Sequence, residues 1–395
     1  MSLSPALAPK IHQRVSLGPD EVVLITGGSG FLGQHIIKLL NERTDGVREI
    51  RVVDIKPFVR RLADYEETIP LKHYNADIAI EDQLDEPFNG ATCIIHCAAV
   101  VDVRHCVDRD RMRSVNIIGT TNVVFKARQW DVPKLILTST TDAVIQHDSE
   151  FNDVQEEQTQ LPLKEKKFLM GYYAFTKAQA EALVICSRNQ KMHNGKRIKT
   201  AILRPTVLYG EEDPYYVPQA LRVAKMSFGF LPQPMVMSKD PTVQSTYVGN
   251  AAWAHILAAM KLNQEVRSEE TVEDWQELDG QSVYINDDTR PGTFYDFMKP
   301  FLALKGYSTL QLPIPFFLMM LWIVTFSYMI QILPGSWRNW LNNKPFLPTP
   351  NSFRLVHKSH TFNRVKATDI LEYSPIYSED KALELSSSYY QNCAL

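Results

Sequence analysis

The stretch "EVVLITGGSGFLG", Glu21 to Gly33, decides the fold of this chain. Its first half is a continuous apolar run, which is typical of a strand buried on both faces of a parallel sheet. Gly27, Gly30 and Gly33 follow at the spacing G-x-x-G-x-x-G, and a helical pattern begins after them. Such a turn lets the backbone approach a pyrophosphate, and the helix N-terminus offers free N–H groups to the charge. The stretch therefore predicts a strand, a dinucleotide-binding turn and a helix.

A second predicted strand, Glu49–Lys56, carries an acid close to its end. Asp54 stands about 20 residues beyond the glycines, where a carboxylate accepts hydrogen bonds from the adenosine ribose hydroxyls. A carboxylate there also repels a 2′-phosphate, so Asp54 favours NAD over NADP as the cofactor. Lys56 opposes this preference, since a nearby cation can accommodate a phosphate. Asp77 follows the expected third strand and either meets the adenine amino group or caps the next helix.

Further apolar runs continue the strand–helix alternation up to residue 210. Predicted strands cover Ala91–Val100, Val132–Thr141 and Lys199–Gly210, and a helix is expected over Ser114–Trp130. This alternation predicts an α/β fold with a doubly wound parallel sheet, the Rossmann fold. We expect a flexible leader over 1–20, an NAD-binding domain over 21–210, and a smaller substrate-binding region over 211–395. Proline- and aromatic-rich loops after Gly210 support the last assignment.

The composition excludes some classes of protein. The formal net charge is −3 and no block of like charges dominates, so a nucleic-acid surface is not expected. The five cysteines form no C-x-x-C pair, which indicates free thiols in a reducing compartment and no metal site.

An apolar segment interrupts the second half of the chain. "LPIPFFLMMLWIVTFSYMIQIL", residues 312–333, contains no charged residue. Its length is within the range of a bilayer-spanning helix, with Pro313 and Pro315 at the helix start. We expect an apolar helix that contacts membrane lipid, either spanning the bilayer or lying in one leaflet. A fully buried helix or the rim of an apolar pocket is the competing interpretation.

A tyrosine and a lysine supply the candidate chemistry. In "MGYYAFTKAQAEALV", Tyr173 and Lys177 are four residues apart and so share one helix face. A nearby ammonium lowers the pKa of a phenol, and a tyrosine tuned in this way can exchange a proton with an alcohol. Tyr172 lies about 100° round the helix and is expected to pack or to line the substrate pocket.

Hydroxyl groups at the end of the strand before this helix complete the set. "LTSTT", Leu137–Thr141, ends at the edge of the sheet where doubly wound folds bind ligands. Ser139, Thr140 and Thr141 are candidates to orient a substrate oxygen. Period-two alternation puts Ser139 and Thr141 on one side and Thr140 on the other, and the pattern does not choose between the sides.

Taken together, these motifs resemble a known family. Their order resembles that of the extended short-chain dehydrogenase/reductases, and two later stretches resemble the 3β-hydroxysteroid dehydrogenase/Δ5–Δ4 isomerase family more specifically. The resemblance runs from about residue 22 to at least residue 297, and the apolar segment resembles that family's membrane-associating region. The matching stretches are "TGGSGFLG", "HCAAVVD", "VNIIGTTNVV", "TSTTDAV", "YYAFTKAQAE", "LRPTVLYG", "TYVGNAAWAHILAA" and "GQSVYINDDTRPGTFYDF".

The resemblance implies roles for individual residues. Tyr173 is then the proton acceptor and donor, Lys177 binds the ribose and tunes Tyr173, and Asn116 bends its helix. The substrate-orienting hydroxyl falls on Thr140, where the family has serine, and Ser139 stays an alternative. The implied catalytic set is Tyr173, Lys177 and Thr140, and the implied cofactor-binding set is Gly27, Gly30, Phe31, Leu32, Gly33, Asp54, Asp77, Ala98, Lys177, Pro205 and Thr206.

The implied function is NAD-dependent oxidation of a 3β-hydroxysteroid or sterol, with Δ5–Δ4 isomerisation left open. Asp287 and Asp288 match the family's acidic pair near the steroid, although Asp-Asp-Thr is also good turn chemistry and we favour the turn. A nucleotide-sugar epimerase, a small-carbonyl reductase and a non-catalytic NAD-binding membrane scaffold are the alternatives. The resemblance further suggests a homodimer on the endoplasmic reticulum with a cytosolic catalytic domain, or on a mitochondrial membrane.

Overall fold

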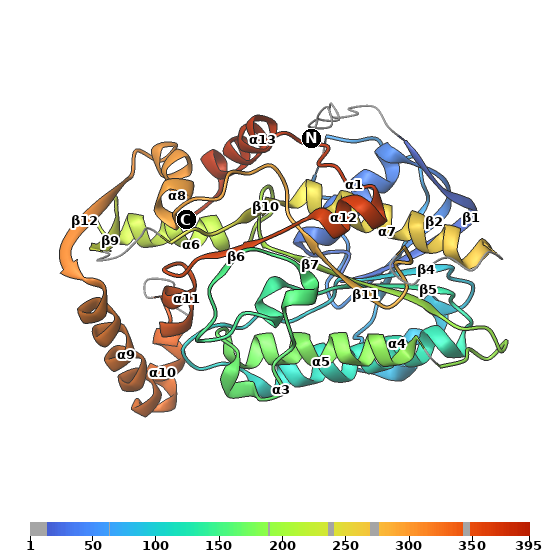
Figure 1. Cartoon of the computed structure of the whole chain (residues 1–395), viewed down its shortest axis with the longest axis horizontal. Coiled ribbons are helices and arrows are strands. Elements are labelled where there is room, and N and C mark those ends of the chain that lie inside the picture. Colours follow the sequence, from blue (N-terminus) through green and yellow to red (C-terminus); the bar gives the residue numbers. More distant parts are fainter. Residues whose placement is uncertain (1–13, 63, 189, 236–240, 269–275, 343–347) are drawn as a thin grey trace.

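The computed structural model describes residues 14–62, 64–188, 190–235, 241–268, 276–342 and 348–395. A seven-stranded sheet in the order β3-β2-β1-β4-β5-β7-β11 lies at its centre (Figure 1). Every neighbouring pair in this sheet is parallel. The strands are β1 (Val15–Thr26), β2 (Thr44–Asp54), β3 (Leu71–Asn75), β4 (Cys93–His96), β5 (Lys134–Thr138), β7 (Lys199–Pro205) and β11 (Gln281–Ile285). The predicted Rossmann-like sheet is confirmed.

Helices cover both faces of the sheet (Figure 1). One face carries α1 (Phe31–Arg43) and α7 (Val248–Arg267), and the other carries α4 (Thr120–Gln129) and α5 (Gly171–Ser187). Because successive strand residues point to opposite faces, Val23 joins the core under α1 and α7, whereas Leu24 joins the core under α4 and α5. This two-sided burial explains the continuous apolar run of β1.

Three smaller strand pairs and several helices surround the sheet. The pairs join β8 (Val207–Tyr209) to β10 (Ser245–Tyr247), β9 (Phe230–Met235) to β12 (Ser308–Pro315), and β6 (Phe151–Val154) to β13 (His360–Phe362). The remaining α-helices are α2 (Asp85–Phe88), α3 (Arg109–Met112), α6 (Tyr216–Met226), α8 (Phe294–Ala303), α9 (Phe316–Ile332), α10 (Gly335–Asn342), α11 (Pro350–Leu355), α12 (Val365–Leu371) and α13 (Glu379–Asn392). A π-helix covers Arg113–Gly119, and 3-10 turns cover Glu81–Leu84, Thr141–Ala143, Glu156–Gln158 and Glu165–Lys167.

The start of the chain differs from the expected leader over 1–20. Residues 1–13 lie outside the described part of the chain, but β1 already begins at Val15. Val15 and Ser16 pair with Thr44 and Asp45 of β2. Val15 and Leu17 are buried in the main core, so apolar packing extends the first strand six residues beyond the predicted start at Glu21.

The predicted boundary at residue 210 does not separate the sheet from the rest. The late strand expected over Lys199–Gly210 is broken after Pro205, and β8 turns away to pair with β10. Two later elements then return to the sheet: β11 pairs with β7, and α7 packs on α1 and β1. The alanine-rich α7 buries most of its length there, which the local pattern could not reveal.

The apolar segment is shorter as a helix than predicted. Leu312 to Pro315 belong to β12, which pairs with β9, and α9 begins only at Phe316. In the part of the chain that the structure describes, no helix is both long enough and apolar enough to cross a membrane.

Candidate active site

The glycine turn after β1 is shaped for close backbone contact. Gly27 has φ of +73°, and a Cβ on it would lie 2.7 Å from the Ala98 nitrogen. A Cβ on Gly33 would lie 2.6 Å from the Gly27 carbonyl oxygen. Gly30 is the N-cap residue of α1 and no side chain caps this helix end, so its first-turn N–H groups can bind a ligand. Phe31 and Leu32 open this helix, and the turn suits a pyrophosphate.

Backbone hydrogen bonds hold Asp54 beside the turn. Ser29 N–H donates to Oδ2 at 3.1 Å and Lys56 N–H donates to Oδ1 at 3.0 Å. Each carboxylate oxygen keeps a lone pair that can accept a ribose hydroxyl. Asp77 accepts the Ala79 N–H at 2.9 Å within the turn before Glu81–Leu84. The N-cap residue of that 3-10 helix is Ile80, which has no side-chain cap, so Asp77 braces the turn and does not cap the helix.

Asn116 ties the segment after β4 to helix α5. It lies in the π-helix, where its Oδ1 accepts the Val100 N–H at 2.7 Å. Its Nδ2 donates to the Val100 carbonyl and to Thr176 Oγ1, both at 2.9 Å. Thr176 in turn donates to the Tyr173 carbonyl at 2.7 Å. Asn116 was expected to bend its helix; in the structure it lies in a π-helical segment and bridges Val100 to the helix that carries Tyr173.

Tyr173 and Lys177 are both buried on α5. Lys177 Nζ donates to the Thr138 carbonyl at the end of β5, at 2.7 Å. Tyr172 points elsewhere: the Arg109 guanidinium lies 3.8 Å from its ring centre, and Tyr172 stacks on Phe175. Tyr172 is therefore a packing residue at the helix edge, one of the two roles expected of it.

The pKa values correct one expectation about this pair. Burial, and then the charge of Asp142, raise the pKa of Tyr173 far above its ordinary value, whereas the sequence predicted that Lys177 lowers it. Burial also lowers the pKa of Lys177 to about 8, with Glu181 acting in the opposite direction. The Lys177 amine binds the Thr138 carbonyl. The effect of desolvation on the pKa of Tyr173 is therefore larger than any effect of the Lys177 charge on the same helix face.

The hydroxyl groups on the two sides of the end of β5 have different hydrogen-bond partners. The Ser139 hydroxyl donates to Glu181 of α5, and Glu181 forms a buried bidentate ion pair with Arg204 of β7. Thr141 is also buried, in the 3-10 turn that packs on α5. Thr140 contacts its own turn instead: its Oγ1 accepts the Asp142 N–H at 3.2 Å and lies beside the Asp142 carboxyl. No other described element holds the Thr140 hydroxyl, so it can turn toward a ligand.

The other expected contact residues are engaged in packing. Pro205 ends β7, the Thr206 hydroxyl lies 2.6 Å from the Thr246 hydroxyl, and the Thr206 N–H donates to the Ile285 carbonyl at 3.1 Å. Asp287 accepts hydrogen bonds from Tyr247 N–H and Asn250 Nδ2 at 2.8 Å and from Thr289 N–H at 3.0 Å. Asp288 pairs with Arg364 at 2.6 Å. These contacts support the turn interpretation of the acidic pair.

Sequence reasoning missed two acids around the end of β5, Glu181 and Asp142. Glu181 lies one helical turn beyond Lys177, a spacing that could have been noticed. Asp142 lies two residues beyond Thr140, and its pKa is raised to about 6 by burial, partly offset by a hydrogen bond with Thr140. A carboxylate directly after a hydroxyl-bearing strand end was the available signal for Asp142.

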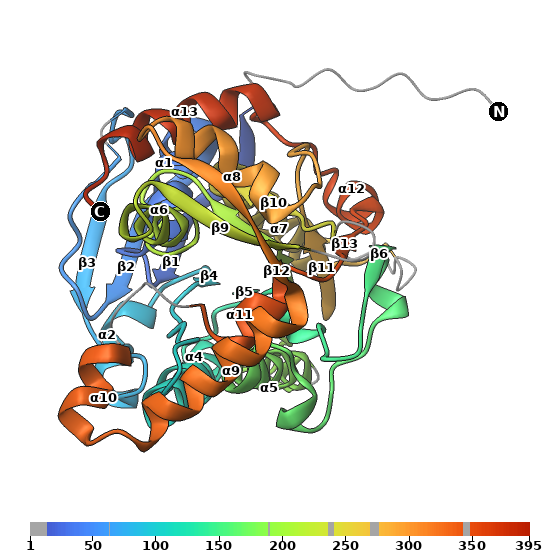
Figure 2. The ribbon, with the colours of Figure 1, turned by 90° about the vertical axis from the view of Figure 1, so that its left-hand side faces the viewer.

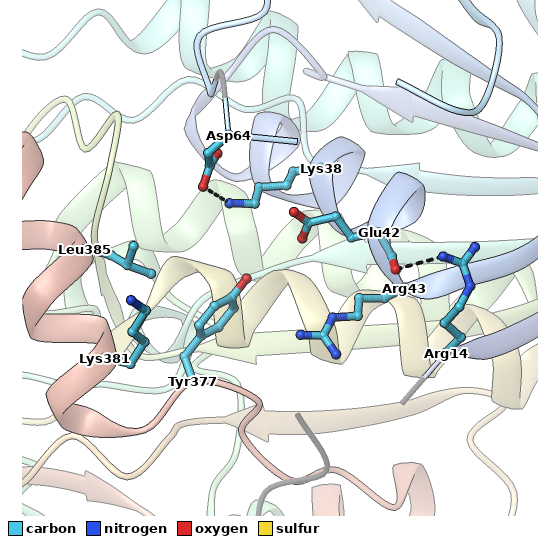
Figure 3. Close-up of a pocket in the computed structure, with 8 residues that line it drawn as sticks. All are labelled: Arg14, Lys38, Glu42, Arg43, Asp64, Tyr377, Lys381 and Leu385. Carbon is cyan, nitrogen blue, oxygen red and sulfur yellow. Dashed lines mark hydrogen bonds and ion pairs between the residues drawn. The ribbon is translucent and has the colours of Figure 1, made fainter. Parts of the chain in front are cut away.

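A cavity of about 590 Å³ lies away from these residues, on the outer side of α1 (Figure 3). Two of its cations have ion-pair partners: Lys38 contacts Asp64, and Arg14 pairs with Asp45 at 2.9 Å while also donating to the Glu42 carbonyl at 3.0 Å. None of the predicted site residues lines it, so it is no candidate for the chemistry.

Comparisons with known proteins agree with this architecture. The model of the 3-beta hydroxysteroid dehydrogenase/isomerase family matches residues 24–315. Among solved structures, UDP-glucose 4-epimerase of Thermus thermophilus, in complex with NAD, is 20% identical with a TM-score of 0.63 over 94% of this chain and 100% of that one.

Two further epimerases are similar. UDP-glucose 4-epimerase of Thermotoga maritima is 19% identical with a TM-score of 0.61, covering 94% of this chain and 98% of its own. UDP-glucuronic acid 4-epimerase of Bacillus cereus, in complex with NAD, is 16% identical with a TM-score of 0.60 over the same shares. At these identities the likeness shows a common fold.

Proposed function

The chain belongs to the 3-beta hydroxysteroid dehydrogenase/isomerase family, and on that premise we propose that it oxidises a 3β-hydroxysteroid or sterol to the 3-ketone with NAD. The observation that carries this proposal is that Lys177 binds the Thr138 carbonyl at the end of β5, while Thr140 opens the 3-10 turn that packs on α5 and shares a core with Tyr173. A hydroxyl, a phenol and an amine in this arrangement suit proton transfer to or from an alcohol.

Each residue has a separate task in this reaction. When bound, NAD would supply the acceptor for the hydride of the alcohol carbon. Thr140 donates a hydrogen bond to the substrate oxygen and fixes its position. Tyr173 takes the hydroxyl proton, and because burial keeps its phenol protonated, it needs the positive charge of Lys177 to act as a base. The amine of Lys177 is already oriented by the Thr138 carbonyl.

The residues expected to hold the cofactor fit a dinucleotide. The glycine turn and the uncapped N-terminus of α1 suit the pyrophosphate, and Asp54 suits the adenosine ribose. Asp54 is also the reason to prefer NAD, because its carboxylate would repel the 2′-phosphate of NADP. The remaining proposed contacts are Phe31, Leu32, Asp77, Ala98, Pro205 and Thr206.

We further propose that α9 and α10 attach the protein to one leaflet of a membrane, where its substrate is dissolved. Both helices lie on the side that faces the viewer in Figure 2. Phe317, Trp322 and Ile332 of α9 are 61%, 56% and 83% exposed, and Trp337 and Trp340 of α10 are also exposed. A contiguous apolar surface rimmed by tryptophans suits the membrane interface. The endoplasmic reticulum, with this domain in the cytosol, agrees with the free cysteines.

The lipid-facing helices are linked to the site. Asn342 at the end of α10 exchanges two hydrogen bonds of 2.8 Å with the backbone of Cys106. His105 packs edge-on against Phe326 of α9. The segment that holds these residues leads from Val100 to α3, so a substrate drawn from the membrane would enter next to the proposed site.

A substrate panel tests the proposal. The detergent-solubilised full chain is incubated with 3β-hydroxysteroids or with UDP-sugars, each with NAD or NADP, and NADH absorbance and sugar products are followed. The expected result is NADH formation with a 3β-hydroxysteroid and NAD. Epimerised UDP-sugar would instead support the epimerase alternative. Normal NAD binding with no turnover of any steroid would refute the proposal and favour the scaffold.

A further inference from the structure

A basic loop near α9 and α10 takes no part in the proposed oxidation. It covers residues 163–167, between β6 and α5, and contains Lys164, Lys166 and Lys167. We propose that this loop binds the headgroups of anionic phospholipids, so that the protein prefers acidic membranes to neutral ones. The inference rests on the proposed attachment through α9 and α10, because a few basic residues supplement an apolar anchor and do not replace it.

The protein holds this loop in a defined shape. Lys167 N–H donates to the Lys164 carbonyl at 2.9 Å, within the 3-10 turn Glu165–Lys167. Phe168 follows and is fully buried in the core around α5. Leu163 is nevertheless 93% exposed, although an apolar side chain of this size gains free energy when it leaves water. The loop therefore presents one apolar group together with its lysines.

The only acid of the loop is neutralised by a residue outside it. The two carboxylate oxygens of Glu165 accept hydrogen bonds from Nη1 and Nη2 of Arg109, each at 2.7 Å. This bidentate pair is the strong geometry for a carboxylate and a guanidinium. It fastens the loop to α3 and leaves the lysine charges uncompensated within the loop.

Two of the three lysines are available to a ligand. Lys167 lies 3.9 Å from the Asp148 carboxylate, so part of its charge is compensated. Lys164 and Lys166 are exposed, and in the described part of the chain no carboxylate lies within ion-pair distance of either amine. The whole chain has a formal net charge of −3, so attraction to an acidic surface has to come from a local patch of this kind.

Contacts place the loop beside α10. Asn342 at the end of α10 exchanges two hydrogen bonds of 2.8 Å with the backbone of Cys106. Arg109 opens α3 shortly after Cys106 and carries the ion pair with Glu165. The loop and the end of α10 are therefore fastened to the two ends of one short segment.

A second set of contacts leads from the loop to α9. His147 N–H donates to the Lys167 carbonyl at 3.1 Å, and the His147 carbonyl accepts a hydrogen bond from Lys358 Nζ at 2.6 Å. Lys358 follows α11, whose Phe353 stacks on Phe316 of α9 with the ring centres 5.3 Å apart. The loop is thus connected to both of the proposed lipid-facing helices.

This neighbourhood favours lipid as the partner of the loop. In Figure 2, α9, α10 and the green loop that leads into α5 lie on the side that faces the viewer. Trp337 and Trp340 of α10 are exposed on the same side, and tryptophan favours the depth at which headgroups meet acyl chains. When α9 lies in the leaflet, Lys164 and Lys166 can reach headgroup phosphates, and Leu163 can enter the boundary below them.

Co-sedimentation of the full chain with vesicles tests the inference. The vesicles contain phosphatidylcholine alone or phosphatidylcholine mixed with phosphatidylserine. We expect wild type to bind the mixed vesicles about 10- to 30-fold more tightly in low salt, since each lysine at an acidic surface contributes about 5-fold. High salt should reduce this gain by screening the charges. Lys164→Gln combined with Lys166→Gln should lose most of the gain and keep its binding to pure phosphatidylcholine.

Two control variants separate charge from apolar contact. Lys191 and Lys196 are also exposed, but they follow the opposite end of α5, a helix about 25 Å long. Lys191→Gln combined with Lys196→Gln should therefore keep the full gain. Leu163→Ser should weaken binding to both kinds of vesicle by a similar factor and leave the preference for phosphatidylserine unchanged.

Several results would overturn the inference. An equal gain in wild type and in the Lys164→Gln, Lys166→Gln variant would do so, because other charges would then cause it. Equal binding of wild type to both kinds of vesicle would also do so and would favour an acidic protein as the partner of the loop, with attachment through α9 and α10 left standing. Binding of wild type to neither kind would refute the proposed attachment itself.

Discussion

The neighbouring hydroxyls of Ser139 and Thr140 should have opposite importance for stability and for catalysis. Ser139 is 5% exposed and its hydroxyl donates to the buried Glu181 carboxylate, which also binds Arg204. Thr140 is engaged only within its own turn and keeps its hydroxyl available for a ligand. Truncating each to alanine therefore separates the two roles, and Thr140→Ser serves as the control that keeps the hydroxyl.

The expected sizes follow from these contacts. Ser139→Ala loses a hydrogen bond to a charged, buried acceptor, which costs about 2 kcal/mol of unfolding free energy. For a chain of 395 residues, an unfolding entropy of about 2.1 cal/mol/K per residue turns that loss into a Tm decrease of about 2 to 3 °C. Thr140→Ala loses a hydrogen bond to the reacting oxygen, worth about 1.5–3 kcal/mol, and kcat should fall about 10- to 100-fold.

Thermal unfolding and steady-state oxidation of a 3β-hydroxysteroid measure the two effects. Ser139→Ala should keep kcat within about 2-fold of wild type, a change of well under 1 kcal/mol. Thr140→Ser should keep most of the activity. The reasoning is refuted if Ser139→Ala loses kcat and Thr140→Ala does not, because Ser139 would then be the substrate-orienting residue.

Three further predictions concern Lys177, Asn116 and the exposed face of α9. Burial lowers the pKa of Lys177 in the folded state to about 8, so the unfolded chain binds more protons than the folded chain between about pH 8 and 10. The unfolding free energy of wild type should therefore rise with pH over this range when compared with that of Lys177→Met. Parallel curves for the two proteins would contradict this prediction. Asn116→Ala removes the partner of the partly buried Val100 N–H and carbonyl, so urea denaturation should show a loss of about 2–4 kcal/mol of unfolding free energy. An unchanged midpoint would be inconsistent with the bridge. Leu321→Ser with Trp322→Ser should reduce co-sedimentation with phospholipid vesicles while the comparably exposed Val365→Ser on α12 does not, and equal binding of both would rule out α9 as the lipid-facing element.

The nucleotide half of the molecule could be predicted because its signals are local. The run from Glu21 to Gly33 encodes strand, turn and helix within a few residues of one another, and the structure has all three. The position of Asp54 at the end of β2 followed from the same pattern. The return of α7 and β11 to the sheet could not be predicted in this way, because it depends on contacts between segments far apart in the chain.

The catalytic half depended on burial and on tertiary partners. Alternation separated Ser139 from Thr140, but the ion pair between Glu181 and Arg204, from two other elements, shows which hydroxyl is already engaged. Helical spacing brought Lys177 to the face of Tyr173, yet it carried no information about desolvation, which raises the phenol's pKa. Spacing predicts which groups meet, whereas packing decides their protonation.

The most direct test of the central claim is the turnover of Tyr173→Phe compared with that of wild type. The variant removes one phenolic oxygen and leaves the ring that packs in the core around α5. NAD should bind with unchanged affinity, while NADH formation from a 3β-hydroxysteroid should fall at least about 100-fold, as expected when a general base is removed. Oxidation by the variant at the wild-type rate would contradict the assignment of Tyr173 and with it the proposed chemistry of this site.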